Sequence, residues 1–134
     1  PARDWVGGAI KMRVLARTLA FRRQQPELYA VGDYLPLALE GERAAHGFAF
    51  ARRQGRLVAV TLVGRHQAAL LDPGRPPPAP PERWGDTALI LPEDLAGTAF
   101  EDRLTGATLA ADGRRLPLRQ ALAGLPVALL VAGG

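Results

Sequence analysis

The hydrophobic period of the sequence changes at Pro26, and this change most constrains the fold. Good helix formers dominate residues 9–25. Pro26 ends the helix because its ring clashes with the preceding turn. Beyond it, short segments alternate between apolar and polar residues with the period of two that β-strands have. The sequence therefore predicts one N-terminal α-helix followed by a mainly β, antiparallel sandwich.

The predicted helix has apolar residues on two of its sides. At about 100° per residue they separate into two groups on the helix surface. The first group is Ile10, Val14 and Phe21, and the second is Met12, Leu15 and Leu19. A helix on the surface of a small domain normally buries one stripe only. We therefore expect this helix to lie between two bodies, one of which is a second protein surface or a second copy of the chain.

Three strands follow in a clear order. Residues 34–40 form the first, and Pro36 places it at an edge or at a position whose N–H is not needed by a neighbour. Residues 46–53 form the second, with Phe48 and Phe50 on one face. Gln54 and Gly55 then turn the chain into residues 56–64. That strand is apolar almost throughout, which predicts a central strand covered on both faces.

The second half of the chain contains shorter strands and one long loop. Six prolines between residues 72 and 82 prevent a helix or a ladder and favour an extended loop. Turn residues separate the strands that follow. We expect these strands at residues 87–91, 98–103, 108–111, 116–118 and 127–131, with one helical turn at 119–122. Several short strands after a single helix are typical of an antiparallel sandwich.

The composition excludes several classes of chemistry. The chain contains no cysteine and no serine, so the commonest nucleophile and histidine arrangements cannot be built. His46 and His66 are twenty residues apart without a carboxylate at a metal-ligand spacing, so no metal and no cofactor is expected. The acidic residues occur as neighbours that flank turns, which predicts solvated side chains rather than a catalytic pair. The paired acids are Glu40 and Glu42, Glu93 and Asp94, and Glu101 and Asp102.

The charge and hydropathy do not favour nucleic acid or membrane as a partner. The net charge is +4, but the arginines are scattered in pairs near turns instead of forming one basic face with interleaved aromatics. The longest apolar stretch, residues 125–132, is interrupted by Pro126 and is too short to span a bilayer. The absence of cysteine permits a reducing compartment. We therefore expect a cytoplasmic location.

Aromatic residues suggest contact with carbohydrate. Exposed tyrosine and tryptophan rings can stack on the apolar face of a sugar, and Trp84 and Tyr34 are the candidates, with Trp5 a further one. The competing interpretation is that Trp84 anchors the turn formed by residues 84–87 in the core and that Trp5 covers an edge of the domain. This interpretation is favoured, because buried aromatics dominate cores.

Several motifs, in this order and at this spacing, resemble the C-terminal region of the maltooligosyl trehalose synthases. The similarity extends over nearly the whole chain. The motifs are Gly8-Ala9-Ile10-Lys11, Leu19-Ala20-Phe21-Arg22-Arg23, Pro26-Glu27-Leu28-Tyr29, Gly32-Asp33-Tyr34-Leu35-Pro36-Leu37, Phe48-Ala49-Phe50-Ala51-Arg52, Trp84-Gly85-Asp86-Thr87, Leu104-Thr105-Gly106 and Leu125-Pro126-Val127-Ala128-Leu129-Leu130.

The resemblance implies a place in the α-amylase-like glycoside hydrolase superfamily, in which a catalytic (β/α)₈ barrel is followed by a β-sandwich. It implies that residues 1–25 correspond to the last barrel helix and residues 26–134 to the C-terminal sandwich. The parent enzyme would be an isomerase that converts the reducing-end α-1,4 bond of a maltooligosaccharide into an α,α-1,1 bond by intramolecular transglycosylation. Its catalytic carboxylates would lie upstream, so no residue here is assigned a catalytic role.

Two functions remain open for the chain itself. The first is a non-catalytic domain that stabilises and orients the barrel, with the N-terminal helix as the contact. The second is a carbohydrate-binding module that holds α-glucan through Trp84 or Tyr34. A homodimer that covers the second face of the helix is also compatible with the sequence.

Overall fold

The computed structural model describes residues 9–64 and 84–133. Helix α2 (Ala9–Gln24) is followed by α3 (Pro26–Ala30), and a single turn, α5 (Leu118–Ala121), lies near the C-terminus. Two 3₁₀ turns, η1 (Ala44–His46) and η3 (Glu93–Leu95), connect strands. The strands are β1 (Asp33–Glu40), β2 (Gly47–Gln54), β3 (Leu57–Gly64), β4 (Ala88–Ile90), β5 (Ala99–Asp102), β6 (Thr108–Ala110), β7 (Arg115–Pro117) and β8 (Val127–Ala132).

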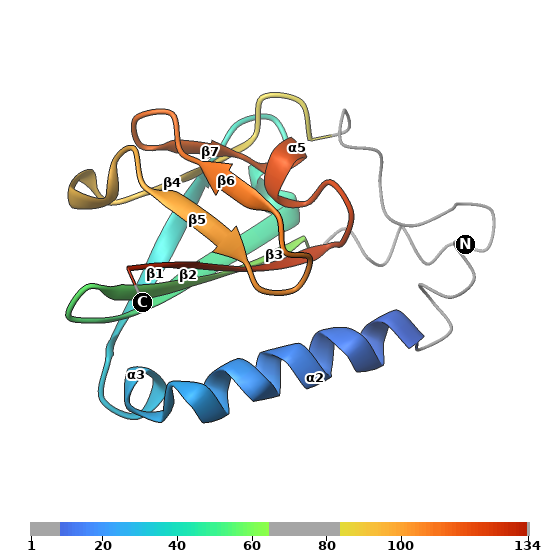
Figure 1. Ribbon diagram of the computed structural model, residues 1–134. Coiled ribbons are helices and arrows are strands. Elements are labelled where there is room, and N and C mark those ends of the chain that lie inside the picture. The colour runs from blue at the N-terminus through green and yellow to red at the C-terminus, as the bar shows by residue number, and fades with distance from the viewer. Residues whose placement is uncertain (1–8, 65–83, 134) are drawn as a thin grey trace.

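The eight strands form one antiparallel sheet in the order β6-β5-β8-β3-β2-β1-β4-β7. The sheet changes direction within β1: residues 33–37 pair with β2, whereas Ala38, Leu39 and Glu40 pair with β4. Strands β4 and β7 therefore fold back over the face of the first strands, which gives the two layers seen in Figure 1. Pro36 lies in the half of β1 that pairs with β2 alone. Its missing N–H is therefore tolerated there.

The main core lies between the two layers. Strand β3 contributes Val58, Val60 and Leu62, all at most 2% exposed, and the register places these residues opposite the inward side chains of β2 and β8. Strand β4 contributes Leu89, and β7 contributes Leu116, both fully buried. This cluster confirms the expectation that β3 is a central strand.

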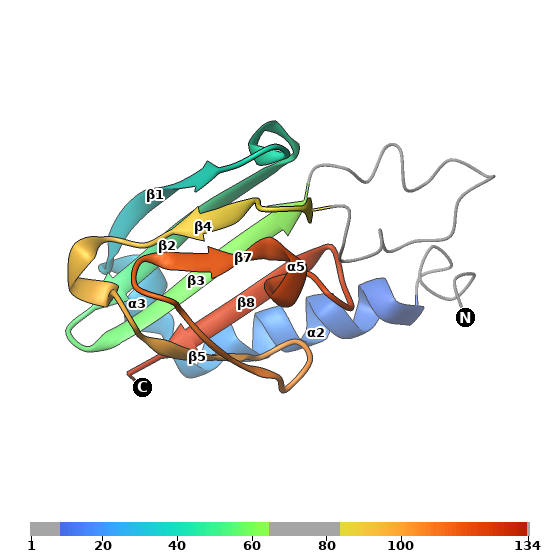
Figure 2. The same cartoon turned by 90° about the horizontal axis from the view of Figure 1, so that it is seen from above.

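The opposite face of β3 and β8 carries helix α2. The residues that alternate with the main core, Ala59 on β3 and Leu129 and Val131 on β8, form a second cluster with Phe21 of α2 and Leu28 of α3. Figure 2 shows α2 running below β8 and β3, while β1 lies away from the helix, across the width of the sheet. The helix therefore covers only part of this face.

The predicted fold class is confirmed, and the strand limits differ from the expected ones by at most a few residues. The main difference is α3, a five-residue helix directly after Pro26, where no helix was predicted. Pro26 ends α2 but begins α3, because proline is tolerated in the first turn of a helix, where its N–H has no partner. The proline-rich loop at 72–82 lies outside the described residues. No helix among those described is long and apolar enough to cross a membrane.

Candidate functional site

The acidic residues do not converge within the described part of the chain. Glu101 pairs with Arg103 at 2.9 Å, Asp94 with Arg53 at 2.6 Å, and Glu40 with Arg115 at 3.5 Å. The hydrogen bond from Arg53 holds the pKa of the Asp94 carboxyl below its usual value. These are separate surface ion pairs, each made by an acid from a different element.

Asp102 differs from the other acids because it is 2% exposed. Its Oδ1 accepts the backbone N–H of Leu104 at 2.9 Å and that of Leu129 at 3.3 Å. Burial raises the pKa of the Asp102 carboxyl, although these hydrogen bonds oppose the effect. The side chain thus holds the β5–β6 turn against β8.

Of the two histidines, only His46 lies in the part of the chain that the structure describes. His46 lies in η1, and His66 is outside the described ranges. Within residues 9–64 and 84–133, no group of three or more metal-binding side chains occurs.

Trp84 lies in the core, with only 4% of its surface exposed. Its ring packs so closely against Gly64 that a Cβ there would lie 3.0 Å from the indole. Two residues of the same turn support the loop at 41–43: Asp86 Oδ1 accepts the N–H of Glu42, and Thr87 Oγ1 accepts that of Arg43. A ring covered in this way has no face to offer a sugar, so the carbohydrate hypothesis depends on Tyr34.

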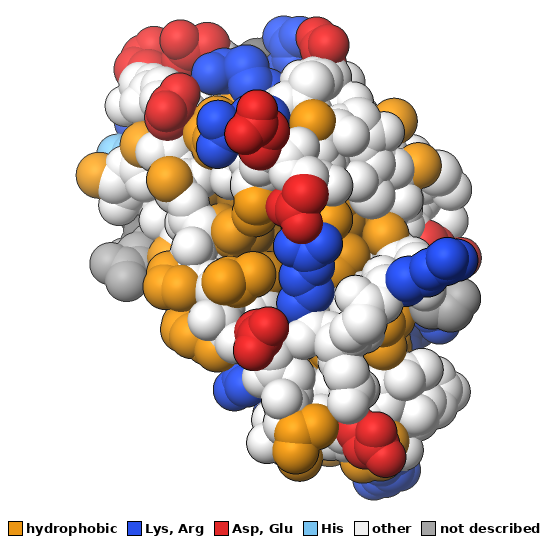
Figure 3. All heavy atoms as spheres, turned by 90° about the vertical axis from the view of Figure 1, so that its left-hand side faces the viewer, with side chains coloured by type: hydrophobic (Ala, Val, Ile, Leu, Met, Phe, Trp, Pro, Cys, Tyr) orange, Lys and Arg blue, Asp and Glu red, His pale blue; other side chains and the backbone are white. Residues whose placement is uncertain are grey.

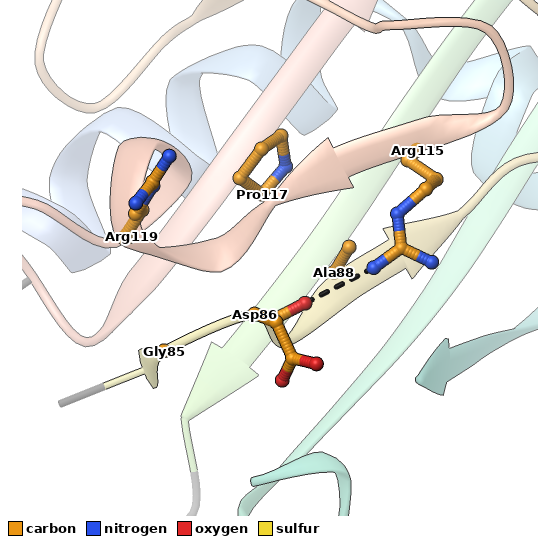
Figure 4. Close-up of a pocket in the computed structure, with 6 residues that line it drawn as sticks. All are labelled: Gly85, Asp86, Ala88, Arg115, Pro117 and Arg119. Atoms are coloured by element: carbon orange, nitrogen blue, oxygen red, sulfur yellow. Dashed lines mark hydrogen bonds between the residues drawn. The ribbon is translucent and has the colours of Figure 1, made fainter. Parts of the chain in front are cut away.

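An open pocket of about 330 Å³ lies beside this turn (Figure 4). Arg115 spans it and donates from Nη2 to the backbone oxygen of Asp86 at 3.0 Å. Arg119 lies on the other side of the pocket, and Pro117 and Ala88 contribute apolar surface. Arg115 is also paired with Glu40. The pocket is shallow and its charges are largely balanced, so it indicates no particular ligand.

A second surface lies on the part of the sheet that α2 leaves uncovered. The strand register places alternate residues of β1 opposite alternate residues of β2 on this face. We call it the β1–β2 outer face, and it consists of Tyr34, Pro36, Ala38, Phe48, Phe50 and Arg52. Tyr34 is 53% exposed and Phe48 is 39% exposed. Apolar side chains of this size are rarely left exposed together without a function.

Arginines and aromatic rings alternate along this face and onto the helices. The ring centroids of Tyr34 and Phe50 are 5.4 Å apart at an interplanar angle of 32°. The Arg52 guanidinium lies 5.2 Å from the Tyr34 ring centroid, and that of Arg22 lies 4.7 Å from the ring of Tyr29. Burial raises the pKa of the Tyr29 hydroxyl, and both arginines oppose this effect. Phe50 and Arg52 were missed as site residues, because only the register shows that they adjoin Tyr34.

The third surface is the outer side of α2, which points away from the sheet. Met12, Leu15 and Leu19 are 66%, 51% and 42% exposed. Phe21, on the opposite side of the helix, is 3% exposed, and Val14 is half-buried. The side chain of Ile10 lies outside the described residues. The two-sided pattern in the sequence is thus confirmed: one side packs on the sheet, and we call the exposed trio the α2 outer stripe.

The side of the molecule that carries α3 and the β2–β3 turn exposes hydrophobic side chains among charged ones (Figure 3).

On the flank of α2 nearest β5, Arg17 donates from Nη1 to the backbone oxygen of Leu104. The Arg103 guanidinium lies 5.7 Å from the Phe21 ring centroid. These contacts fix the helix to the sheet on that flank. The large exposed hydrophobic side chains lie on the α2 outer stripe, on the β1–β2 outer face and at Val31 between α3 and β1.

Comparison with known proteins shows that the chain is similar to maltooligosyl trehalose synthases. It is 37% identical over 121 residues to putative maltooligosyl trehalose synthases from two strains of Mycobacterium tuberculosis. The solved structure of a mutant maltooligosyltrehalose synthase from Arthrobacter ramosus superposes with a TM-score of 0.64 and 34% identity over 92% of this chain. No model of a protein family matches the chain.

The matches cover almost all of this chain but little of the relatives. The chain spans 13% of the length of the curated relatives and 14% of the solved chain. Both similarities extend over the helix and the sheet together, since they include at least 90% of the residues. The chain belongs to the maltooligosyl trehalose synthase family and corresponds to a C-terminal portion of its members.

Proposed function

We propose that this chain is the non-catalytic C-terminal domain of a cytoplasmic maltooligosyl trehalose synthase. The observation that carries the proposal is the match to such synthases over 90% of this chain and 13% of theirs. A domain of this size supports the larger part of the enzyme, which holds the chemistry. That chemistry is the conversion of the reducing-end α-1,4 bond of a maltooligosaccharide into an α,α-1,1 bond.

The side chains of the described region support a non-catalytic role. Glycoside chemistry needs two carboxyl groups that converge across one sugar, and one of them needs a raised pKa. Asp102 has a raised pKa, but it is buried against the backbone of Leu104 and Leu129 and cannot reach a substrate. Three other acids, Glu40, Asp94 and Glu101, are on the surface and bound to arginines.

The α2 outer stripe is the contact with the catalytic part in this proposal. Met12, Leu15 and Leu19 form an exposed apolar strip on the helix that leads into the domain. Burial of such side chains contributes about 1.5–3 kcal/mol each when complete. The relatives have most of their length outside the matched region, which provides a surface to cover the stripe. Arg22 and Arg23, in the last turn of α2, favour acidic residues at one end of that surface.

A complementation experiment tests the domain role. A synthase from Mycobacterium tuberculosis is truncated by the matched portion, and this chain is supplied as a separate polypeptide. We expect the truncated enzyme to lose activity or solubility and the added chain to restore trehalose-end formation from maltoheptaose. Full activity of the truncated enzyme, or conversion of maltoheptaose by this chain alone, would contradict the proposal.

A paired set of variants tests the contact surface. Leu15→Asp with Leu19→Asp places two charges in the stripe and should abolish restoration while leaving the fold intact, because both side chains are exposed. Thr108→Asp with Ala110→Asp adds the same charge on exposed positions of β6 and should restore activity normally. Light scattering distinguishes the alternative occupant: a dimer of the chain that dissociates in the first variant would show that a second copy covers the stripe.

A further inference from the structure

We infer that a pocket between α2 and the β5–β6 turn receives an acidic side chain from the catalytic part of the synthase. The inference rests on the proposed function and deepens it, because it adds a charged contact to the apolar one at the α2 outer stripe. Its evidence is the convergence of Arg17 and Arg103 on one cavity, beside a helix that contains no acidic residue.

The pocket has a volume of about 200 Å³ and two arginines in its wall, and we call it the arginine pocket. Arg17 comes from α2 and Arg103 from the β5–β6 turn, and Ala20, Phe21 and Gln24 of α2 complete the lining. Both arginines are exposed, whereas Phe21 is buried. Like charges repel, so an anion in the cavity would stabilise both guanidinium groups.

Each guanidinium uses only part of its hydrogen-bonding capacity within the described part of the chain. Arg17 donates from Nη1 to the backbone oxygen of Leu104, and Arg103 pairs through Nε with Glu101 at 2.9 Å. The Nη groups of Arg103 make no bond to a described residue. A guanidinium has five N–H donors in a planar fork that matches the two oxygens of a carboxylate. The arginine pocket therefore suits a carboxylate that enters from outside.

The positive charge of α2 is not balanced within the helix. Its basic residues are Lys11, Arg13, Arg17, Arg22 and Arg23, and it has no acid. Five of the 17 basic residues thus lie on α2, which leaves 12 basic against 13 acidic residues elsewhere. Arg22 and Arg23 lie in the last turn, where the helix dipole favours cations. Arg13 and Arg17 are four residues apart within the helix, where like charges are destabilising. An acidic side chain supplied from outside relieves that repulsion.

The arginine pocket adjoins the α2 outer stripe. At about 100° per residue, Ala16 and Ala20 lie on the helix surface between Leu19 and Arg17, and both are exposed. Their small side chains leave no barrier between the stripe and the pocket. The two form one surface that is apolar at its centre and basic at its edge. This surface fits a protein with an apolar patch bordered by an acid, whereas the charged backbone of a nucleic acid does not suit the apolar part.

NMR of the arginine side chains, with acetate as the probe, tests the pocket on this chain alone. We expect the Nε–Hε signals of Arg17 and Arg103 to shift and to saturate, with a Kd of about 10–100 mM for a lone carboxylate. Arg119 lines the pocket beside β7, on the layer away from α2, and is the internal control. Its signal should shift no more than in a sodium chloride titration at equal ionic strength.

Two substitutions at Arg103 separate charge from geometry. Arg103→Gln removes the charge and should weaken the acetate binding seen at Arg17 about tenfold or more. Arg103→Lys keeps the charge but lacks the planar fork, so it should weaken binding by about threefold. It also keeps a cation beside Phe21, so the fold of this variant should persist. Arg119→Gln is the matched control and should bind acetate like the parent chain.

Restoration of the truncated synthase tests whether the catalytic part supplies the carboxylate. Arg103→Glu reverses the charge at the arginine pocket and should raise the concentration of this chain that gives half-maximal activity about tenfold. Arg119→Glu makes the same change of charge on the other layer and should restore activity like the parent chain. Added sodium chloride should weaken restoration by the parent chain more than restoration by Arg103→Gln, because salt screens the ion pair.

Three outcomes would overturn the inference: no saturable shift with acetate, equal acetate binding by Arg103→Gln and the parent chain, or equal restoration by Arg103→Glu and the parent chain. Binding of a short DNA duplex to α2 at physiological salt would also overturn it, since this would assign the basic flank to nucleic acid.

The domain role fails separately. If the parent chain does not restore the truncated synthase, the domain role and the source of the carboxylate are both wrong, and the acetate titration still decides whether the pocket binds a carboxylate. If the parent chain restores activity and Arg103→Glu does so equally, only the arginine pocket is wrong.

Discussion

The Asp102 carboxylate accepts a hydrogen bond from the backbone nitrogen of Leu129, which is twenty-seven residues further along the chain. The same oxygen also accepts the N–H of Leu104 within its own turn. The β5–β6 turn is thereby fixed to β8, the strand that carries α2 on its outer side. One buried acid therefore links the end of the sheet to the helix-bearing face.

Replacement of Asp102 separates the hydrogen bonds from the charge. Asp102→Ala leaves two buried N–H groups without an acceptor, and we expect the free energy of unfolding to fall by about 1–3 kcal/mol. Asp102→Asn keeps an acceptor oxygen at the same position and should cost less than the alanine variant. Urea unfolding of the three chains measures the order. Equal stability of the alanine variant and the parent would show that these bonds contribute nothing.

The stability contributed by Asp102 should fall as the pH rises. The native pKa is raised above the ordinary value of 3.8, so between the two pKa values the native state binds more protons than the unfolded state. The contribution is fully present below 3.8 and is lost as the pH rises through the native pKa. Subtracting the unfolding free energy of Asp102→Asn from that of the parent at each pH cancels the contribution of the other acids. If the parent instead gains stability relative to Asp102→Asn as the pH rises, the native pKa of Asp102 is lowered.

Gly41 should not tolerate a side chain. Its φ is +121°, and a Cβ would lie 2.6 Å from Thr87 Cα, at the point where the loop at 41–43 meets the Trp84 turn. Backbone strain and a backbone clash together predict a loss of about 2 kcal/mol or more for Gly41→Ala. Gly124 has open space within 4 Å and no positive φ, so Gly124→Ala is the matched control, expected within about 0.5 kcal/mol of the parent. Thermal unfolding of the parent and both variants measures these differences in stability.

Phe21 is the main attachment of α2 to the sheet. It is 3% exposed and packs with Leu129 and Val131, so Phe21→Ala should lower the stability by about 3–5 kcal/mol. Hydrogen exchange in α2 should increase more than exchange in β3, because β3 also belongs to the main core. Met12 is 66% exposed, so Met12→Ala is the control and should alter neither the stability nor the hydrogen exchange of α2. Uniform acceleration across both elements would show that α2 and the sheet unfold as one unit.

The predicted elements followed from patterns that depend on neighbouring residues alone. The apolar run of β3 predicted its central place. Pro36 predicted an edge or a position whose N–H is not needed, and the half of β1 that contains Pro36 pairs with β2 alone. Helix α3 was missed because proline both ends one helix and begins another, and local preference does not distinguish the two cases. For the candidate site, Tyr34 was identified from its type, but Phe50 and Arg52 were not, because contact between strands depends on register.

The sequence by itself determined the element types, the two-sided helix and the absence of serine and cysteine chemistry, since each depends on residue type and spacing along one segment. Only the tertiary structure decided which side of α2 is buried. The apolar groups that contain Phe21 and Leu15 are equivalent in the sequence pattern. In the structure Phe21 is buried in a cluster with Ala59, Leu129 and Val131 of the sheet, whereas Leu15 is exposed. Packing between segments that are distant in the sequence leaves no trace in the periodicity of either segment.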